Sequence, residues 1–303
     1  MLLRAVPVLV FALLIARTSF ADSGILLLAH GGSAEWNARV TELAAKVNAT
    51  RATEVAFGMA ARVTIQAAID KLVARGVTEI VAVPLFVSSW STVITSTEYL
   101  LGLRVEAPAA LASYAKMNHA PAAASPTAPT GHESHTPTPD GTTPVRSPVP
   151  VRMTQALNDH PIVADILASR ARTISRDRAA EALIIVAHGP NEDEDNARWL
   201  ADMRALAERI GQTERFASIE YLTLRDDAPK PVRDAATAHL RELVQRELKG
   251  GRRVLVVPLL ISFGGIEKGL RERLNGLEYT LADAALMPDD RMAAWVLGMA
   301  GPR

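Results

Sequence analysis

The sequence contains no cysteine among its 303 residues. Disulfide bonds and thiolate ligands are therefore excluded, so stability comes from packing, and any metal ion is bound through histidine, carboxylate or carbonyl oxygen. No excess of charge is present either, because 33 basic residues balance 33 acidic ones. Nucleic-acid binding usually needs a strongly basic surface, so nucleic acid is not expected as a partner.

Long apolar runs are also missing, since none reaches the roughly 20 residues that a membrane-spanning helix requires. The run at Ala5–Ala16 follows Arg4 and precedes small residues at Ser19 and Ala21. A basic start, a short apolar run and small residues before a cleavage point are typical of a signal peptide. We predict that residues 1–21 are removed and that the mature protein is exported, periplasmic or secreted, without membrane contact.

Two stretches of the chain repeat each other. Residues 25–47 and 183–210 share an apolar run, Ala-His-Gly, an acidic stretch, Asn-Ala-Arg and a helical pattern, in the same order. The apolar residues of the helical patterns recur every three or four positions, which predicts one buried face for each helix. These residues are Trp36, Val40, Leu43, Ala44 and Val47 in the first copy, and Trp199, Met203, Leu206, Ala207 and Ile210 in the second.

The elements that follow are repeated as well. A second strand is expected at Glu54–Phe57 and at Ser218–Leu222, and the third strands are EIVAVPLFV and RVLVVPLLI. A fourth strand and a terminal helix complete each copy. Continuously apolar strands that alternate with helices are typical of a parallel sheet covered on both faces. We predict an α/β fold of two tandem domains, each a four-stranded parallel sheet with helices on both faces.

The predicted boundaries are 24–175 for the first domain and 180–303 for the second. Residues 118–147 interrupt the first copy with a composition of Ala, Pro, Thr and Ser that buries too little apolar surface to fold, which predicts a disordered insertion. Its histidines are either uncommitted polar residues of a tether or a loose metal-gathering arm. They are His119, His132 and His135.

His30 and His188 are the candidate site residues, because each follows the first strand of its copy in the sequence Ala-His-Gly. Ligands of parallel sheets bind at the carboxyl ends of the strands, and glycine lets the backbone approach closely. Imidazole binds divalent transition metals and accepts protons near neutral pH. The structural alternative for either residue is a histidine satisfied by backbone hydrogen bonds at a strand end.

Other enzyme classes that use a His-Gly sequence are disfavoured by its neighbours. A histidine phosphatase requires arginine where Ala29 and Ala187 stand, and a serine hydrolase requires a G-x-S-x-G sequence that the chain lacks. A phosphate loop requires more glycines and a lysine, whereas Glu35 and Glu192–Asp195 follow the two histidines. These carboxylates suit the start of a helix, where they either cap it or attract a cation.

The pattern resembles the class II tetrapyrrole chelatases, the CbiX and SirB type of sirohydrochlorin cobaltochelatase and ferrochelatase, in their long two-copy form. The matching features are strand, Ala-His-Gly, acidic stretch, Asn-Ala-Arg and helix, together with VPLF, VPLL, SFGGIEKGL and ALNDHP. The resemblance covers nearly all of the mature chain except residues 118–147. It implies a lyase-type chelatase of tetrapyrrole synthesis, such as cobalamin biosynthesis, that inserts a divalent metal into a tetrapyrrole.

In that family, a histidine after the first strand binds the metal or accepts pyrrole protons, a role that the resemblance transfers to His30 and His188. The implied partners are a tetrapyrrole and a divalent ion, cobalt or iron as substrate, with nickel and zinc as other ions that imidazole binds. No organic cofactor is implied. The sequence does not indicate an oligomeric state.

The sequence departs from the family at two further site positions in each copy. Thr92 and Ile266 stand where a second histidine is expected beyond the third strand, and Met59 and Thr223 where a glutamate is expected after the second. These side chains cannot replace an imidazole or a carboxylate base. The alternative interpretation is therefore an exported metal-binding or metal-delivery protein that keeps the fold without catalysis.

Charged residues follow the second strand of the second copy, at Arg225, Asp226 and Asp227. They form either a solvated loop or contacts with a metal or with substrate carboxylates. His160 precedes a helix, where a capping or packing role is expected, and His239 lies within a helix with a structural role expected.

Overall fold

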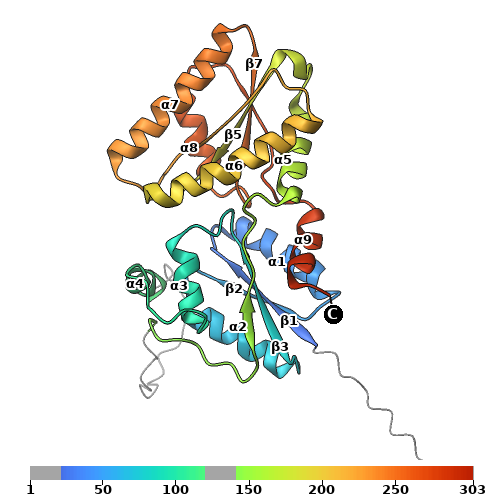
Figure 1. Ribbon diagram of the computed structural model, residues 1–303, viewed down its shortest axis with the longest axis vertical. Helices are drawn as coiled ribbons and strands as arrows, with labels where there is room; N and C mark the ends of the chain where they lie inside the picture. The colour runs from blue at the N-terminus through green and yellow to red at the C-terminus, as the bar shows by residue number, and fades with distance from the viewer. Residues whose placement is uncertain (1–21, 120–140, 303) are drawn as a thin grey trace, which may run out of the picture.

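Two continuously buried strands, β1 (Ser23–Ala29) and β5 (Glu181–Ala187), form the centres of two separate sheets in the computed structural model, which describes residues 22–119 and 141–302. The strand orders are β2-β1-β3-β4 and β6-β5-β7-β8, and all neighbouring strands are parallel. Figure 1 shows the two domains stacked one above the other, with helices on both sides of each sheet. The predicted α/β class with two four-stranded parallel sheets is confirmed.

The helices and strands alternate in the expected order. In the first half of the chain they are β1, α1 (Ala34–Asn48), β2 (Thr53–Phe57), α2 (Arg62–Ala74), β3 (Glu79–Leu85), α3 (Thr92–Leu100), α4 (Leu111–His119) and β4 (Val151–Met153). In the second half they are α5 (Pro161–Ile174), η1 (Arg178–Ala180), β5, α6 (Asp193–Thr213), β6 (Ser218–Thr223), α7 (Lys230–Lys249), β7 (Arg253–Leu259), α8 (Ile266–Arg273), β8 (Thr280–Leu281) and α9 (Arg291–Ala300). Within the described ranges, no helix has the length and apolar character needed to cross a membrane.

Helices α1 and α6 bury the faces that the sequence predicts. The five apolar residues expected for each helix are the buried residues of that helix. Helix α1 begins after Ser33, whose hydroxyl accepts a hydrogen bond from the backbone N–H of Trp36 at 3.2 Å. The apolar periodicity therefore predicted both helices and their orientation on the sheets.

The two terminal helices are exchanged between the domains. Helix α5 follows β4 in the chain but packs on α6 and β7 of the second domain, whereas α9 follows β8 and packs on α1 and β3 of the first. Figure 1 shows α9 beside the lower sheet and α5 beside the upper one. We expected each copy to keep its own last helix, and this was wrong. Apolar periodicity identifies the buried face of a helix but not the sheet on which that face packs.

The exchanged helix α9 is fixed to the first domain at its end. Trp295 on this helix is only 2% exposed, and it belongs to the core cluster. Arg152 of β4 donates to the carbonyl of Ala300 at 2.7 Å, and Arg51 donates to the carbonyl of Gly301 at 3.0 Å. The last turn of the chain therefore completes a domain whose first strand begins at Ser23.

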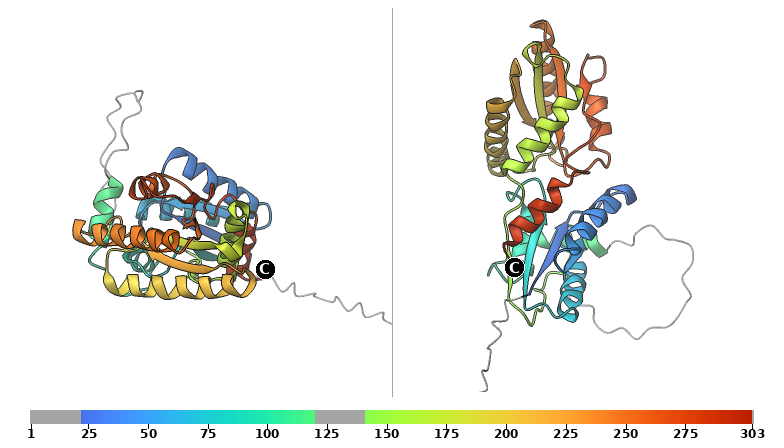
Figure 2. Two further views of the ribbon diagram at one scale, coloured as in Figure 1. Left: turned by 90° about the horizontal axis from the view of Figure 1, so that it is seen from above. Right: turned by 90° about the vertical axis from the view of Figure 1, so that its right-hand side faces the viewer.

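The carboxyl ends of the two sheets face each other. Trp90, which follows β3, accepts at its carbonyl a hydrogen bond from the indole N–H of Trp199 at 2.8 Å, and the Arg198 guanidinium lies 4.7 Å from its ring centroid. Trp36 of α1 contacts Gly264, which follows β7, so closely that a Cβ there would lie 3.2 Å from its ring. Figure 2 shows the same end-to-end stacking from the side. Residues that follow strands of both domains therefore share one junction.

Asp202 of α6 lies half-buried at this junction, and one of its carboxylate oxygens has no hydrogen-bond partner among the described residues. Burial raises the pKa of Asp202 to about 6, helped by the negative charge of Asp159 and opposed by a hydrogen bond from Trp90. Between about pH 6 and the ordinary pKa range of aspartate, Asp202 is therefore protonated in the folded protein but ionised in the unfolded chain. It follows that this carboxylate opposes folding at neutral pH and stops doing so in acid.

We expect Asp202→Asn to stabilise the protein at pH 7 by about 1–2 kcal/mol, and the gain to disappear as the pH falls from 6 to 4. Urea unfolding of both proteins between pH 4 and 7.5 measures this difference, with the exposed Asp283→Asn as control. Burial lowers the pKa of His160, so protonation of this side chain destabilises the folded protein in acid. This effect is the same in both proteins and cancels in the comparison. A difference that does not change with pH would contradict the prediction.

Part of the insertion predicted at residues 118–147 is bound to the first domain. Residues 120–140, with His132 and His135, lie outside the described residues, and His119 ends α4. Residues 141–147 are held against the first domain instead of being free, since the N–H of Val145 donates to the Leu100 carbonyl at 2.8 Å and Arg62 donates to the Thr143 carbonyl at 2.8 Å. Hydrogen bonds from neighbouring elements order this backbone, which composition alone does not reveal.

Candidate functional site

The two Ala-His-Gly sequences lie at the edges where the domains meet. His30 follows β1 and His188 follows β5, so each lies at the carboxyl end of a central strand. Nδ1 of His30 is 2.5 Å from the carbonyl oxygen of Gly31, and Nδ1 of His188 is 2.8 Å from that of Gly189. A carbonyl can only accept, so a neutral imidazole carries its proton on Nδ1 and leaves the lone pair on Nε2.

Glycine is needed after each histidine because the backbone turns there. Gly31 has φ +81° and Gly189 has φ +78°, a left-handed conformation that strongly favours glycine. The second turn is also crowded, because a Cβ on Gly189 would lie 2.5 Å from Cβ of Thr223, whereas one on Gly31 would meet nothing closer than 3.8 Å. The second copy therefore holds its histidine in the tighter turn.

The surroundings of His188 include a carboxylate. Its Nε2 lies 3.4 Å from Oδ2 of Asp227, and the His188 side chain is 28% exposed. The loop that carries Asp227 is fixed by Arg225, whose backbone N–H donates to the carbonyl of His188 at 2.6 Å and whose Nε donates to the carbonyl of Pro190 at 3.1 Å. The sequence left Asp227 undecided between a solvated loop and a contact, and the structure brings it to His188.

The surroundings of His30 differ. This side chain is exposed, and the residues after β2 are Gly58, Met59, Ala60 and Ala61, which carry no carboxylate. The two histidines are therefore not equivalent, although both follow the first strand of their copies. The sequence signal for this difference was the loop composition after the second strand.

The positions of the missing companion residues hold side chains with other contacts. The hydroxyl of Thr92 is 2.6 Å from that of Tyr114, and the buried Thr223 donates to Asn196 at 2.6 Å. Ile266 is the first residue of α8 and packs on the core of the second domain. Among residues 22–119 and 141–302, no group of three or more His, Cys, Asp or Glu is arranged to hold a metal ion.

A mainly apolar groove of about 740 Å³ runs along β6, between α6 and α7. Its walls include Leu200, Tyr221, Val232 and the side chain of His239. Asn196, Thr223 and Arg225 also line the groove, and these residues connect it to the turn that holds His188. A volume between about 300 and 1,000 Å³ is usual for organic ligands. His239 was expected to be structural, and its place on a groove wall was not predicted.

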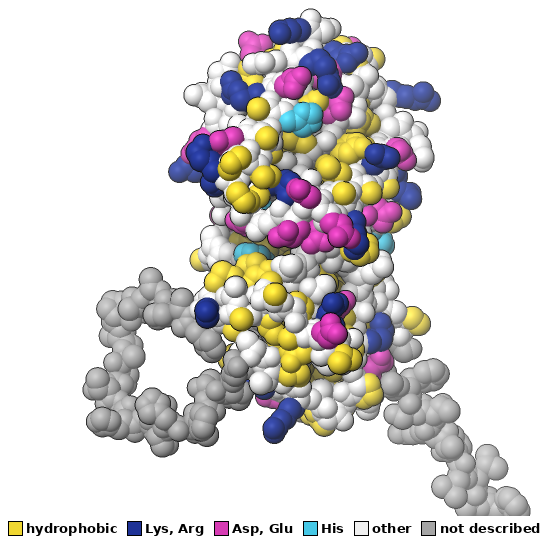
Figure 3. Space-filling model, turned by 60° about the vertical axis from the view of Figure 1, so that its left-hand side comes forward, with side chains coloured by type: hydrophobic (Ala, Val, Ile, Leu, Met, Phe, Trp, Pro, Cys, Tyr) yellow, Lys and Arg dark blue, Asp and Glu magenta, His cyan; other side chains and the backbone are white. Residues whose placement is uncertain are grey.

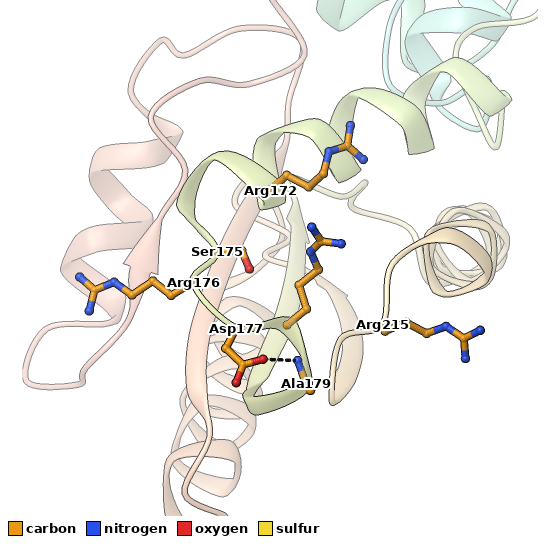
Figure 4. A pocket seen from close by; sticks show the side chains of 7 residues that line it. Arg172, Ser175, Arg176, Asp177, Ala179 and Arg215 are labelled. Carbon is orange, nitrogen blue, oxygen red and sulfur yellow. Dashed lines mark hydrogen bonds between the residues drawn. The ribbon is translucent and has the colours of Figure 1, made fainter.

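A second hollow, of about 310 Å³, lies beyond the end of α5 and is lined by arginines (Figure 4). Arg172 and Arg178 form ion pairs with Glu214. Arg176 and Arg215 point in opposite directions in Figure 4, so the guanidinium groups do not converge on one ligand. The hollow borders the start of β5, at the edge of the sheet opposite His188. The mixed charge of the surface in Figure 3 likewise offers no single strongly basic face in that view.

Comparisons with known proteins give one family match. The CbiX family model matches residues 24–174, and no curated protein sequence matches the chain. The fold is similar to SirB from Bacillus subtilis with Fe3+ (TM-score 0.58, 13% identity, covering 92% of this chain and 94% of that chain). It is also similar to a CbiX described as the terminal enzyme of siroheme biosynthesis in denitrifying bacteria (TM-score 0.50, 16% identity, covering 92% and 100%). At these identities the likeness shows a common fold across both domains.

Proposed function

This chain belongs to the CbiX family of class II tetrapyrrole chelatases, and from that premise we propose that it inserts a divalent metal, cobalt or iron, into a tetrapyrrole of the sirohydrochlorin type. Relatives of the fold have been solved with Fe3+ and, for SirB of Bacillus subtilis subspecies spizizenii, with cobalt. The observation that carries the proposal is the pair of histidines at the facing sheet edges. Each has its Nε2 lone pair directed away from its own backbone hydrogen bond.

The chemistry requires a metal that is held and then released. Insertion replaces two pyrrole protons by one divalent ion, so the site must supply the ion and a group that accepts protons. A neutral imidazole can bind the metal or accept a proton at Nε2, but it cannot do both at once. Two histidines at one junction could divide these two tasks. The groove along β6 includes Arg225, which also binds the turn after His188, and its volume is one that organic ligands occupy, which supports an organic substrate at this side.

The test is metallation of sirohydrochlorin by the purified mature protein with Co2+ or Fe2+, followed by absorbance. We expect a rate above that of the protein-free mixture, and a loss of about 100-fold in the doubly substituted His30→Ala, His188→Ala protein, because a positioned proton acceptor contributes at least that factor. Circular dichroism of the variant controls for folding. A wild-type rate equal to the protein-free rate would sink the proposal.

A second candidate function is metal binding or delivery without catalysis. It is favoured by the contacts of Thr92 and Thr223, which stand where family members are expected to have a histidine and a glutamate. In the same experiment, metal bound through the histidines without any metallation would support this candidate.

We also propose export, which the sequence of residues 1–21 supports. Mass spectrometry of the periplasmic protein should find Asp22 as its first residue.

A further inference from the structure

We infer that the second domain carries the divalent-metal site, with the carboxylate of Asp227 as a ligand beside Nε2 of His188, and that the first domain has no equivalent site. This inference deepens the proposed function, because it assigns the metal of that function to one copy. It rests on the distance between the two side chains, on the loop that fixes Asp227 and on the contrast between the copies.

The distance fits two ligands of one ion. Bonds of roughly 2.1 Å from a transition metal to nitrogen and oxygen separate neighbouring ligand atoms by roughly 3.0 Å in an octahedron and 3.4 Å in a tetrahedron. Nε2 of His188 and Oδ2 of Asp227 are 3.4 Å apart. A charge-assisted hydrogen bond between such groups would be shorter, at about 2.7–2.9 Å.

The hydrogen bond on the other side of the ring favours a metal between these atoms. Because Nδ1 of His188 faces the carbonyl of Gly189, the neutral imidazole presents a lone pair at Nε2. The carboxylate of Asp227 presents lone pairs as well. Two such acceptors repel each other unless a cation lies between them. A proton on Nε2 would hold them at hydrogen-bonding distance, whereas a divalent ion holds them at the observed 3.4 Å.

The loop that holds Asp227 is fixed before any metal binds. Arg225 has φ +53° and forms an ion pair with Asp193 at 2.6 Å, in addition to its bonds to the backbone of the His188 turn. The neighbouring Asp226 forms an ion pair with Arg273, and the N–H of Ala228 donates to the carbonyl of Arg225 at 3.0 Å. Both neighbours of Asp227 are therefore engaged elsewhere, which leaves its 72% exposed carboxylate to face His188.

Two protein ligands leave most of the coordination positions open. A site that must pass its metal to four ring nitrogens benefits from such openness, because water and then the macrocycle fill the remaining positions. The first domain offers only the exposed His30, since its corresponding loop at Gly58–Ala61 has no carboxylate. The copies have therefore taken different roles.

The test is titration of the mature protein with Co2+ alone, by calorimetry and by the visible absorption of the bound ion. We expect one site, weakened at least about tenfold by His188→Ala and by Asp227→Asn. Asp70→Asn is the matched control, because it removes an exposed aspartate on α2 of the first domain, and it should bind within about twofold of the wild type. His30→Ala distinguishes the two copies, since the inference predicts that Co2+ affinity depends on His188 and not on His30.

Three results would overturn the inference. Unchanged affinity in Asp227→Asn would remove this carboxylate from the ligands, and a loss in His30→Ala instead of His188→Ala would assign the metal to the first domain. No binding by the wild type would leave the contact as an ordinary ion pair. The metallation experiment with sirohydrochlorin tests the proposed function separately, since an enzyme can take its metal directly in the presence of the macrocycle. Thermal unfolding of Asp227→Asn distinguishes a lost ligand from a lost fold.

Discussion

Trp295→Ala is expected to destabilise the first domain by about 3–5 kcal/mol, although residue 295 lies near the end of a chain whose second half forms the other domain. The indole is 2% exposed and fills the core between α9, α1 and β3. Its loss leaves a cavity that the neighbouring side chains cannot fill completely. Urea unfolding measures the size of the effect, and hydrogen exchange shows where it acts.

The matched control is Trp295→Phe, which keeps an aromatic ring and most of the volume. The indole N–H has no hydrogen-bond partner among the described residues, so phenylalanine removes no hydrogen bond. We expect this variant to lose less than half of the stability that alanine loses. Faster hydrogen exchange in β5 and β7, with β1 and β3 unchanged, would contradict the packing of α9 on the first domain.

Gly189→Ala should cost about 3 kcal/mol, whereas Gly31→Ala should cost about 1 kcal/mol. Both glycines have positive φ, so both substitutions pay for a left-handed alanine. Only at Gly189 does the new Cβ collide with a neighbour, at 2.5 Å from Cβ of the buried Thr223. The difference between the two variants therefore isolates the collision, and denaturant unfolding of both measures it.

Relief of the collision provides a further check. In a Gly189→Ala, Thr223→Gly double variant the colliding carbon is absent. We expect this variant to lose less stability than the sum of the losses in the two single variants. Co2+ binding should follow the same order, because the turn at Gly189 orients His188. Equal costs for Gly31→Ala and Gly189→Ala would show that the second turn is free to shift.

The sequence predicted the features that depend on local pattern. The buried faces of α1 and α6 follow from apolar spacing alone, and the positions of His30 and His188 follow from the apolar strands that precede them. Parallel pairing followed from strands without polar alternation. Each of these properties depends on neighbours within a few residues, which the sequence displays directly.

Other features depend on contacts between distant residues. No local pattern indicates that α5 packs on β7, since its apolar face would suit either sheet. Asp227 looks like a loop residue in sequence, and it meets His188 only because Arg225 adopts a positive φ and binds the neighbouring turn. The raised pKa of Asp202 likewise requires the junction that Trp90 helps to bury.

The exchange of α5 and α9 gives the chain the topology of a swapped dimer whose two partners are joined end to end. Neither domain corresponds to an uninterrupted piece of the gene, because a cut between residues 175 and 180 leaves the first sheet without α9 and gives it a helix that belongs to its neighbour. Expression of the two halves as separate proteins should therefore yield soluble material only when they are produced together. The chain crosses the junction twice, between β4 and α5 and between β8 and α9, so two covalent connections join the domains.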